Sequence, residues 1–243
     1  MKKIVILTEG QSELIFVRHC LLILFDNSKL SFDCIKLYSN EQQIVPYSYK
    51  GGNADIFFLI VNVGNDDRVV SAIKERERHF FQKGYEYIIG IRDMYSTVYD
   101  KKSGGKIKRE LTSLILREMK TEINKMSSPE NISIHYSIME FEVWVLSMYD
   151  LFLKLHKRLT LKHIEGQIGF NLSAIDPQEV FYKPSSTLSA ILRSVSINYN
   201  KSANIIEKLT SLMDQSDIDT AVENNRCQSL NTFYHELLAF RDS

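Results

Sequence analysis

Apolar and polar residues along the first part of the chain follow the order strand, helix, strand. Residues 3–8 form a short β-branched apolar run, and residues 13–25 place apolar side chains at helical spacing. The order repeats with an apolar run at 55–63, a charged amphipathic segment at 66–83 and another apolar run at 85–91. Strands that alternate with helices predict an α/β fold, with a mainly parallel sheet and helices on both of its faces.

The pattern becomes more helical after residue 106. We expect a long helix over 107–126, an alternating strand over 132–138 and a very apolar helix over 140–156 that carries Trp144, which we expect to pack in the core. The Gly- and Lys-rich segment 100–106 predicts an exposed, mobile loop.

Two domains follow from this pattern. The predicted α/β domain covers residues 1–156, and a mostly helical C-terminal extension over 157–243 packs on it, with loops at Asp176-Pro177 and Lys183-Pro184-Ser185.

Composition narrows the class of protein. The 243 residues are 44% apolar and 25% charged, which is typical of a globular chain and excludes a disordered one. Thirty basic residues balance thirty acidic residues, so any attraction to nucleic acid must be local. Three cysteines without a C-x-x-C pair fit neither a disulfide framework nor a thiolate zinc site, which favours a cytoplasmic protein.

A membrane association is not expected. The first apolar run is interrupted by Glu9, and no other run reaches the roughly 18 residues of a membrane span. The sequence does not indicate an oligomeric state.

Acidic residues follow three of the predicted strands. Glu9 and Glu13 come after the first strand, Asp93 after the strand at 85–91, and Glu140 and Glu142 after the strand at 132–138. Ligands of open α/β sheets bind beyond the carboxyl ends of the strands. If these strands are neighbours, the carboxylates would repel one another unless a divalent cation compensated them, and oxygen-only ligands suit Mg²⁺ or Mn²⁺.

Each acid also has an ordinary explanation. Glu9 is compatible with a turn, and Glu13, Glu140 and Glu142 are compatible with acids in the first turn of a helix. Asp93 beside Arg92 is compatible with a surface ion pair.

Two short motifs resemble a known family. Thr8-Glu9-Gly10-Gln11-Ser12-Glu13 resembles the E-G-x-[ST]-[DE] signature of TOPRIM domains, which occur in topoisomerases, bacterial primases and overcoming-lysogenization-defect (OLD) nucleases. Met139-Glu140-Phe141-Glu142-Val143-Trp144 resembles the H-E-F-E-A-W element of small bacterial TOPRIM-related proteins of undefined function, often encoded beside ATPases in phage-defence loci. Further matches along the C-terminal part are Lys183-Pro184-Ser185, Tyr199-Asn200-Lys201, Cys227 and Phe233.

The resemblance implies a TOPRIM-like (Rossmannoid) sheet and roles for individual residues. Glu9 would be a metal ligand or general acid/base, Glu13 an additional ligand of the OLD type, and Asp93 the first aspartate of the D-x-D pair. The second aspartate is replaced by Tyr95 and the histidine of H-E-F-E-A-W by Met139, so Glu140 or Glu142 would compensate. Lys201 would be the catalytic cation by its family position; a solvated surface lysine is the alternative.

A basic segment offers a local site for a phosphate backbone. It consists of Lys101, Lys102, Lys106, Lys108 and Arg109. Tyr95 and Tyr99 lie near it and are candidates for stacking on bases. A solvated flexible loop is the alternative interpretation.

These features lead to three hypotheses of function. The first is a Mg²⁺- or Mn²⁺-dependent nuclease, or nuclease-like effector, that hydrolyses phosphodiester bonds of DNA or RNA; the resemblance implies an ATPase-linked phage-defence system as its setting. The second is a catalytically weak TOPRIM-fold subunit that regulates or binds an ATPase partner, which the replacement at Tyr95 favours. The third is an α/β enzyme that acts on small phosphorylated molecules.

Overall fold

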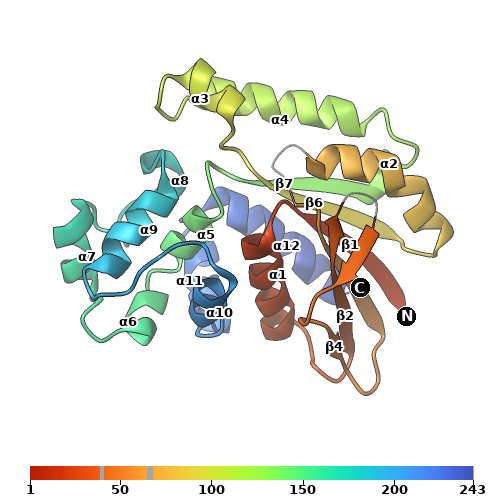
Figure 1. Ribbon diagram of the computed structural model, residues 1–243, viewed down its shortest axis with the longest axis horizontal. Helices are drawn as coiled ribbons and strands as arrows, with labels where there is room; N and C mark the ends of the chain where they lie inside the picture. The colour runs from red at the N-terminus through yellow and green to blue at the C-terminus, as the bar shows by residue number, and fades with distance from the viewer. Residues whose placement is uncertain (39–40, 65–67, 243) are drawn as a thin grey trace. The chain divides into compact units, whose positions relative to one another are not determined.

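The computed structural model describes residues 1–38, 41–64 and 68–242 (Figure 1). A seven-stranded sheet runs in the order β3-β2-β5-β1-β6-β7, and β4 pairs with β2 beside this path. The strands are β1 (Lys2–Thr8), β2 (Leu30–Tyr38), β3 (Glu41–Ile44), β4 (Tyr49–Lys50), β5 (Ile56–Asn62), β6 (Tyr87–Asp93) and β7 (Ile132–Ser137).

Helices follow the strands and fill the C-terminal part of the chain. They are α1 (Gln11–Leu24), α2 (Arg68–Gln82), α3 (Thr97–Ser103), α4 (Arg109–Ile123), α5 (Glu142–Ser147), α6 (Leu151–Leu155), α7 (Leu161–Ile168), α8 (Pro177–Val180), α9 (Pro184–Arg193), α10 (Ala203–Thr210), α11 (Gln215–Glu223) and α12 (Gln228–Arg241), with a 3-10 turn at Pro129–Asn131. No helix among the described residues combines the length and the apolar character needed to cross a membrane.

The sheet is mixed but mainly parallel, which confirms the predicted α/β class. β1 lies between β5 and β6 and is parallel to both, and β2 is parallel to β5, whereas β3 and β4 pair with β2 in the antiparallel sense. At the end of β1, Thr8 is paired with Asn62 on one side and with Ile91 on the other. The ends of these central strands therefore meet at one edge of the sheet.

Contacts divide the chain into two compact units. Unit 1 comprises Met1–Arg92 and Lys108–Tyr136, and unit 2 comprises Asp93–Ile107 and Ser137–Ser243. This grouping differs from the predicted division at residue 156. The segment after β7 is grouped with the C-terminal helices because its side chains pack among them, as Trp144 shows below.

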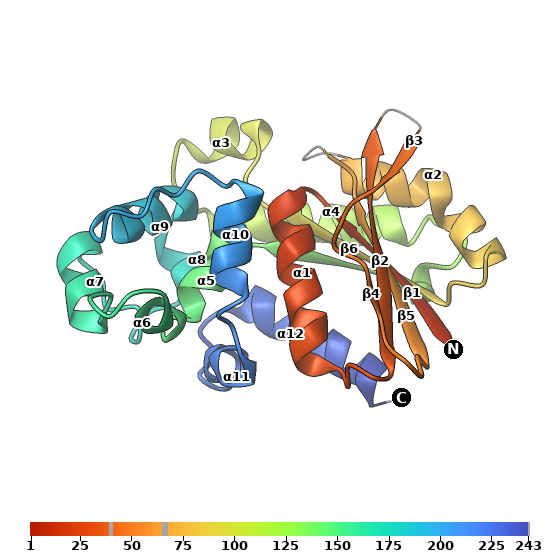
Figure 2. The same cartoon turned by 60° about the horizontal axis from the view of Figure 1, so that its bottom comes forward.

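Unit 1 has a hydrophobic core on each face of the sheet. Alternate residues of β1 face opposite sides, and Val5 and Leu7 pack in a cluster with Val69 and Ile73 of α2. α1 covers the other face (Figure 2). Both faces of β1 are therefore buried, as its continuous apolar run indicates.

Unit 2 is built around α5. Trp144 is fully buried, its ring stacks on Phe233 of α12 at 5.4 Å between centroids, and its indole N–H donates to Ser229 Oγ at 2.8 Å. The structure confirms the core position predicted for Trp144, and α5 also contacts α8 and α9.

Several predicted elements need correction. The helix predicted over 140–156 is two short helices, α5 and α6, because the chain leaves the helical conformation at Met148. The predicted mobile loop at 100–106 contains the end of α3, which Ser96 caps by accepting from the Tyr99 N–H, and which ends at Gly104 with a φ of 67°. The predicted helix at 66–83 is α2, and Asp66 and Asp67 lie outside the described residues.

Two predicted loops are helix starts. Asp176 caps α8 by accepting from the Gln178 N–H, and Pro177 is the first helical residue. Pro184 likewise begins α9. Proline suits this position because its missing N–H would have no partner inside the helix.

Candidate acidic site

The predicted acidic residues stand where three neighbouring strands end. Glu9 directly follows β1, Asp93 is the last residue of β6, and Glu140 lies three residues after β7. β1, β6 and β7 are consecutive in the sheet. These strands are therefore neighbours, as the argument from the sequence required.

In unit 1, Glu9 and Glu13 belong to the turn between β1 and α1. Both are buried, with 7% and 6% of their surface exposed. The Thr8 hydroxyl donates to the Gly10 carbonyl at 3.2 Å and shapes this turn. The Glu13 carboxylate folds back against Gly10, and a Cβ at Gly10 would lie 2.9 Å from Glu13 Oε2. Glycine at this position therefore makes room for the Glu13 carboxylate.

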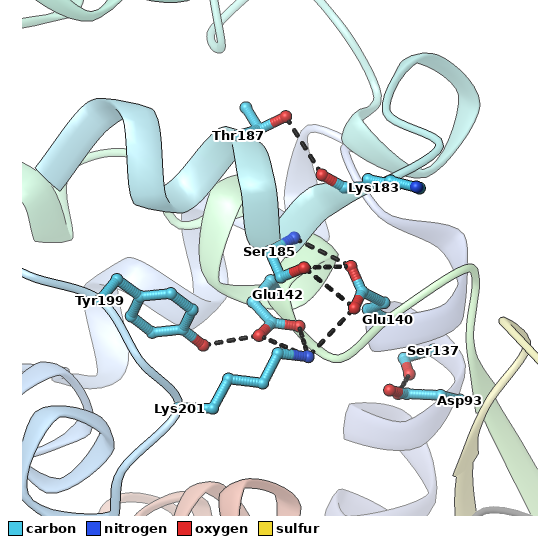
Figure 3. A network of polar contacts seen from close by, with 9 residues as sticks. All are labelled: Asp93, Ser137, Glu140, Glu142, Lys183, Ser185, Thr187, Tyr199 and Lys201. Atoms are coloured by element: carbon cyan, nitrogen blue, oxygen red, sulfur yellow. Dashed lines mark hydrogen bonds and ion pairs between the residues drawn. The ribbon is translucent and has the colours of Figure 1, made fainter. Parts of the chain in front are cut away.

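In unit 2, an ammonium group joins the two acids that follow β7 (Figure 3). Lys201 Nζ lies 3.1 Å from Glu140 Oε1 and 3.0 Å from Glu142 Oε1. The side chain of Glu142 is fully buried, that of Glu140 is 14% exposed and that of Lys201 is 43% exposed. Lys201 thus neutralises part of the charge of two carboxylates and still reaches solvent.

Neutral side chains complete this network. The Ser185 backbone N–H donates to Glu140 Oε2 at 3.0 Å, and its hydroxyl donates to the same oxygen at 2.7 Å. The Tyr199 hydroxyl donates to Glu142 Oε1 at 2.6 Å. We call the five residues Glu140, Glu142, Ser185, Tyr199 and Lys201 the Lys201 network.

Burial and neighbouring charges shift the pKa values of Glu142 and Lys201 in opposite directions. Burial raises the pKa of the Glu142 carboxyl above its ordinary value, although Lys201 and Tyr199 favour the ionised form. Burial also opposes the charge of Lys201, but the carboxylates of Glu142 and Glu140 outweigh it and raise the pKa of the ammonium. Lys201 is therefore a cation throughout the neutral range.

Asp93 adds a third carboxylate to this part of unit 2. Its side chain accepts a hydrogen bond from the Ser137 hydroxyl, and its charge contributes to the raised pKa of Lys201. The backbone N–H of Met94 donates to the Ser137 carbonyl at 2.9 Å, and that of Tyr95 donates to the Met139 carbonyl at 2.7 Å. These bonds fix the chain that follows β6 to the chain that follows β7.

Two residues of this region adopt a left-handed backbone conformation without being glycine. Met139, which precedes Glu140, has a φ of 72°, and Lys201 has a φ of 54°. This conformation costs roughly 1–2 kcal/mol for an L-residue, and such strain clusters at functional sites. The fold therefore maintains the positions of Glu140 and Lys201 against a local cost.

The acids differ in how well they would suit a metal ion. Among residues 1–38, 41–64 and 68–242, no group of three His, Cys, Asp or Glu side chains has the arrangement of a metal centre. Both oxygens of Glu142 already contact Lys201, and the side chain is fully buried, so it fits a role in positioning Lys201. Asp93 and Glu140 are less buried, and three carboxylates facing one ammonium leave an excess of negative charge that a divalent cation would balance.

The predicted basic segment is not a single element. All five side chains are exposed, but Lys101, Lys102 and Lys106 belong to unit 2, whereas Lys108 and Arg109 belong to unit 1. The proposed stacking role of Tyr99 is wrong, because its side chain is fully buried. Tyr95 is partly buried and meets the Tyr182 ring edge-on at 5.8 Å.

Sequence reasoning did not assign a role to Ser185 or Tyr199. Both occur in the short matches that carry the family resemblance, Lys183-Pro184-Ser185 and Tyr199-Asn200-Lys201, and this was the only signal available. Nucleophilic cysteine chemistry finds no support, because burial raises the pKa of Cys34 and Cys227 to about 12.

Comparisons with known protein families, characterised proteins and solved structures found no match to this chain. The TOPRIM resemblance therefore rests on the quoted motifs and stays a prediction.

Proposed function

We propose that the protein is a TOPRIM-like phosphodiesterase that uses Mg²⁺ or Mn²⁺ to hydrolyse nucleic acid. The observation that carries the proposal is that β1, β6 and β7, three consecutive strands of the sheet, are each followed or ended by acidic residues. Carboxylate oxygens are the ligands that these hard cations prefer.

The acids have separate roles in this proposal. Within unit 2, Asp93 and Glu140 are oxygen donors for a divalent ion. Within unit 1, Glu9 and Glu13 are oxygen donors for a divalent ion. A divalent ion bound by such carboxylates lowers the pKa of a water molecule and polarises a phosphate oxygen.

Within unit 2, Lys201 supplies a fixed positive charge beside Glu140. The fully buried carboxylate of Glu142 holds the Lys201 ammonium, and Tyr199 fixes that carboxylate in turn. A cation that is already oriented stabilises the charge that develops on a phosphate during hydrolysis, without reorganisation at the moment of reaction.

Cleavage of plasmid DNA and of total tRNA in Mg²⁺ or Mn²⁺ tests the proposal. We expect cleavage by the full chain, a strong loss in Glu9→Gln and in Asp93→Asn, and no cleavage by the double variant. Glu165→Gln, on an exposed position of α7, is the matched control and is expected to retain activity. Equal cleavage by the double variant and the unchanged chain would contradict the proposal.

A second function is favoured by one specific observation. Lys201 and Ser185 already satisfy the oxygens of Glu140, and Tyr95 occupies the position of the second D-x-D aspartate. A protein with these features suits a regulatory or binding subunit of an ATPase. Absence of metal-stimulated cleavage by the chain alone and with a co-purifying ATPase would favour this second function over the first.

A further inference from the structure

A pocket of about 460 Å³ lies within unit 2, between α9 and the segment that carries Tyr199 and Lys201. Three serines of α9 line it, Ser185, Ser186 and Ser189, together with Arg193 at the end of the helix. Lys201 connects the pocket to the acidic site, because its side chain lines the pocket while its ammonium contacts Glu140 and Glu142.

The lining has the chemistry of an anion site. It provides the Arg193 guanidinium and the hydroxyls of Ser186 and Ser189, and none of the described residues that line it is acidic. The Lys201 ammonium and the Ser185 hydroxyl also line it but are bound to the carboxylates of the acidic site. Arg193 Nη2 lies 3.5 Å from Ser189 Oγ, which places the guanidinium at the pocket wall. An arginine fork matches the geometry of phosphate oxygens, and serine hydroxyls donate to the same group.

The size of the pocket indicates more than an inorganic anion. Pockets of about 300–1,000 Å³ enclose small organic ligands, and 460 Å³ falls within this range. Ala190 adds an apolar surface beside the serines. A phosphate that is attached to a larger body, such as a nucleoside, suits this combination of charge and volume.

We propose that this pocket binds the phosphate group of a nucleotide, which Arg193 holds by charge and the hydroxyls of Ser186 and Ser189 hold by hydrogen bonds. The nucleotide is either free or the phosphorylated end of a nucleic-acid strand. Binding at the pocket requires neither a divalent ion nor cleavage, so the inference goes beyond the proposed hydrolysis and does not depend on it.

Titration calorimetry of the full chain in EDTA tests the inference without any catalysis. The ligands are the four ribonucleoside 5′-monophosphates, adenosine without phosphate, and a trinucleotide with a 5′-phosphate or a 5′-hydroxyl. We expect a dissociation constant below 1 mM for at least one phosphorylated ligand and none measurable for adenosine. Preference for monophosphates over the phosphorylated trinucleotide identifies a free nucleotide; binding of both identifies a strand end.

Two variants test the pocket by different means. Arg193→Gln removes one charge and is expected to weaken binding at least about tenfold, as loss of a charged hydrogen bond implies. Ser189→Leu fills the pocket without changing the charge and is expected to abolish binding. Arg158→Gln, which removes an exposed arginine outside the pocket, is the control and is expected to bind normally.

Three results would overturn the inference: no binding of any phosphorylated ligand, equal binding of adenosine, or unchanged binding by both pocket variants with a native circular dichroism spectrum. Failure of nucleic-acid cleavage alone leaves these binding measurements unaffected, so the two proposals fail separately.

Discussion

The Tyr199 hydroxyl donates a hydrogen bond of 2.6 Å to Glu142, a carboxylate with no exposed side-chain surface. The bond fixes the acid that in turn fixes Lys201. A buried carboxylate that loses a donor pays for its desolvation without compensation, so this phenol contributes to stability as well as to the geometry of the site.

Tyr199→Phe should therefore destabilise the protein without disturbing its shape. We expect the free energy of unfolding to fall by about 1.5–3 kcal/mol, the range for hydrogen bonds to charged groups. Urea denaturation followed by the fluorescence of Trp144 measures this change. Tyr47→Phe, which keeps the ring next to Arg18, is the control; an equal effect of both variants would contradict the role given to Tyr199.

Lys201→Met should change how the free energy of unfolding depends on pH. The raised pKa of Lys201 means that its contribution is complete below the ordinary value of 10.5 and is lost as pH rises through the higher value in the folded protein. At pH 8 we expect the variant to lose about 2 kcal/mol of unfolding free energy, because removing one partner leaves a buried charge uncompensated.

The same variant should recover toward acid pH. The pKa of Glu142 is already raised above 4.5 and rises further without Lys201, so protonation relieves the buried charge. Urea denaturation at pH 5, 8 and 11 is therefore expected to show the largest difference between variant and unchanged chain at pH 8. A difference that is constant across these values would refute the assignment.

Gly10→Ala should displace Glu13 at little cost to the fold. The backbone of Gly10 is extended, with a φ of −141° and a ψ of −173°, which alanine adopts readily. Its Cβ would meet only the end of the flexible Glu13 side chain. We expect weaker Mn²⁺ binding by titration calorimetry with a melting temperature within about 2 °C of the unchanged protein, because the backbone at position 10 accommodates alanine.

Gly166→Ala, on α7 with open space around the glycine, is the control for that experiment. If Gly10→Ala binds Mn²⁺ as tightly as this control does, Glu13 is not a ligand.

Phe233→Ala should open a cavity beside the only tryptophan. Both rings are fully buried and lie parallel, with 9° between their planes. We expect a loss of about 3–5 kcal/mol, as for other large-to-small aromatic substitutions in cores, with a red shift of the Trp144 emission. The control is Leu153→Ala, at a side chain that is 55% exposed, and it should change neither the stability nor the Trp144 emission. A small effect of Phe233→Ala would show that the two rings contribute little to the core.

The central strands were predictable because their runs are continuously apolar. β1 and β5 are buried on both faces, and such strands leave a strong local signal. β2 was not predicted, although Ser31 and Asp33 alternate with apolar residues in the pattern of a strand. Its place is set by pairing with β5, a tertiary contact that the local sequence does not encode.

The site was predictable only in part for a similar reason. The topology rule for parallel sheets located the acids at strand ends, but Ser185 lies 45 residues from Glu140, and Tyr199 lies 57 residues from Glu142. No local pattern connects residues so far apart. Nor do residue types reveal the left-handed backbone at Met139 and Lys201, because methionine and lysine rarely adopt it.

The division into two units determines when each unit is complete during synthesis of the chain. Each unit is assembled from two separate stretches, with crossings after Arg92, Ile107 and Tyr136. During synthesis, unit 1 lacks α4 and β7 until residue 136 has left the ribosome, by which time the first stretch of unit 2 has already emerged. No single cut of the chain separates the two units. A chain truncated after Arg92 or Ile107 has an incomplete sheet, and a chain truncated after Tyr136 lacks the second stretch of unit 2.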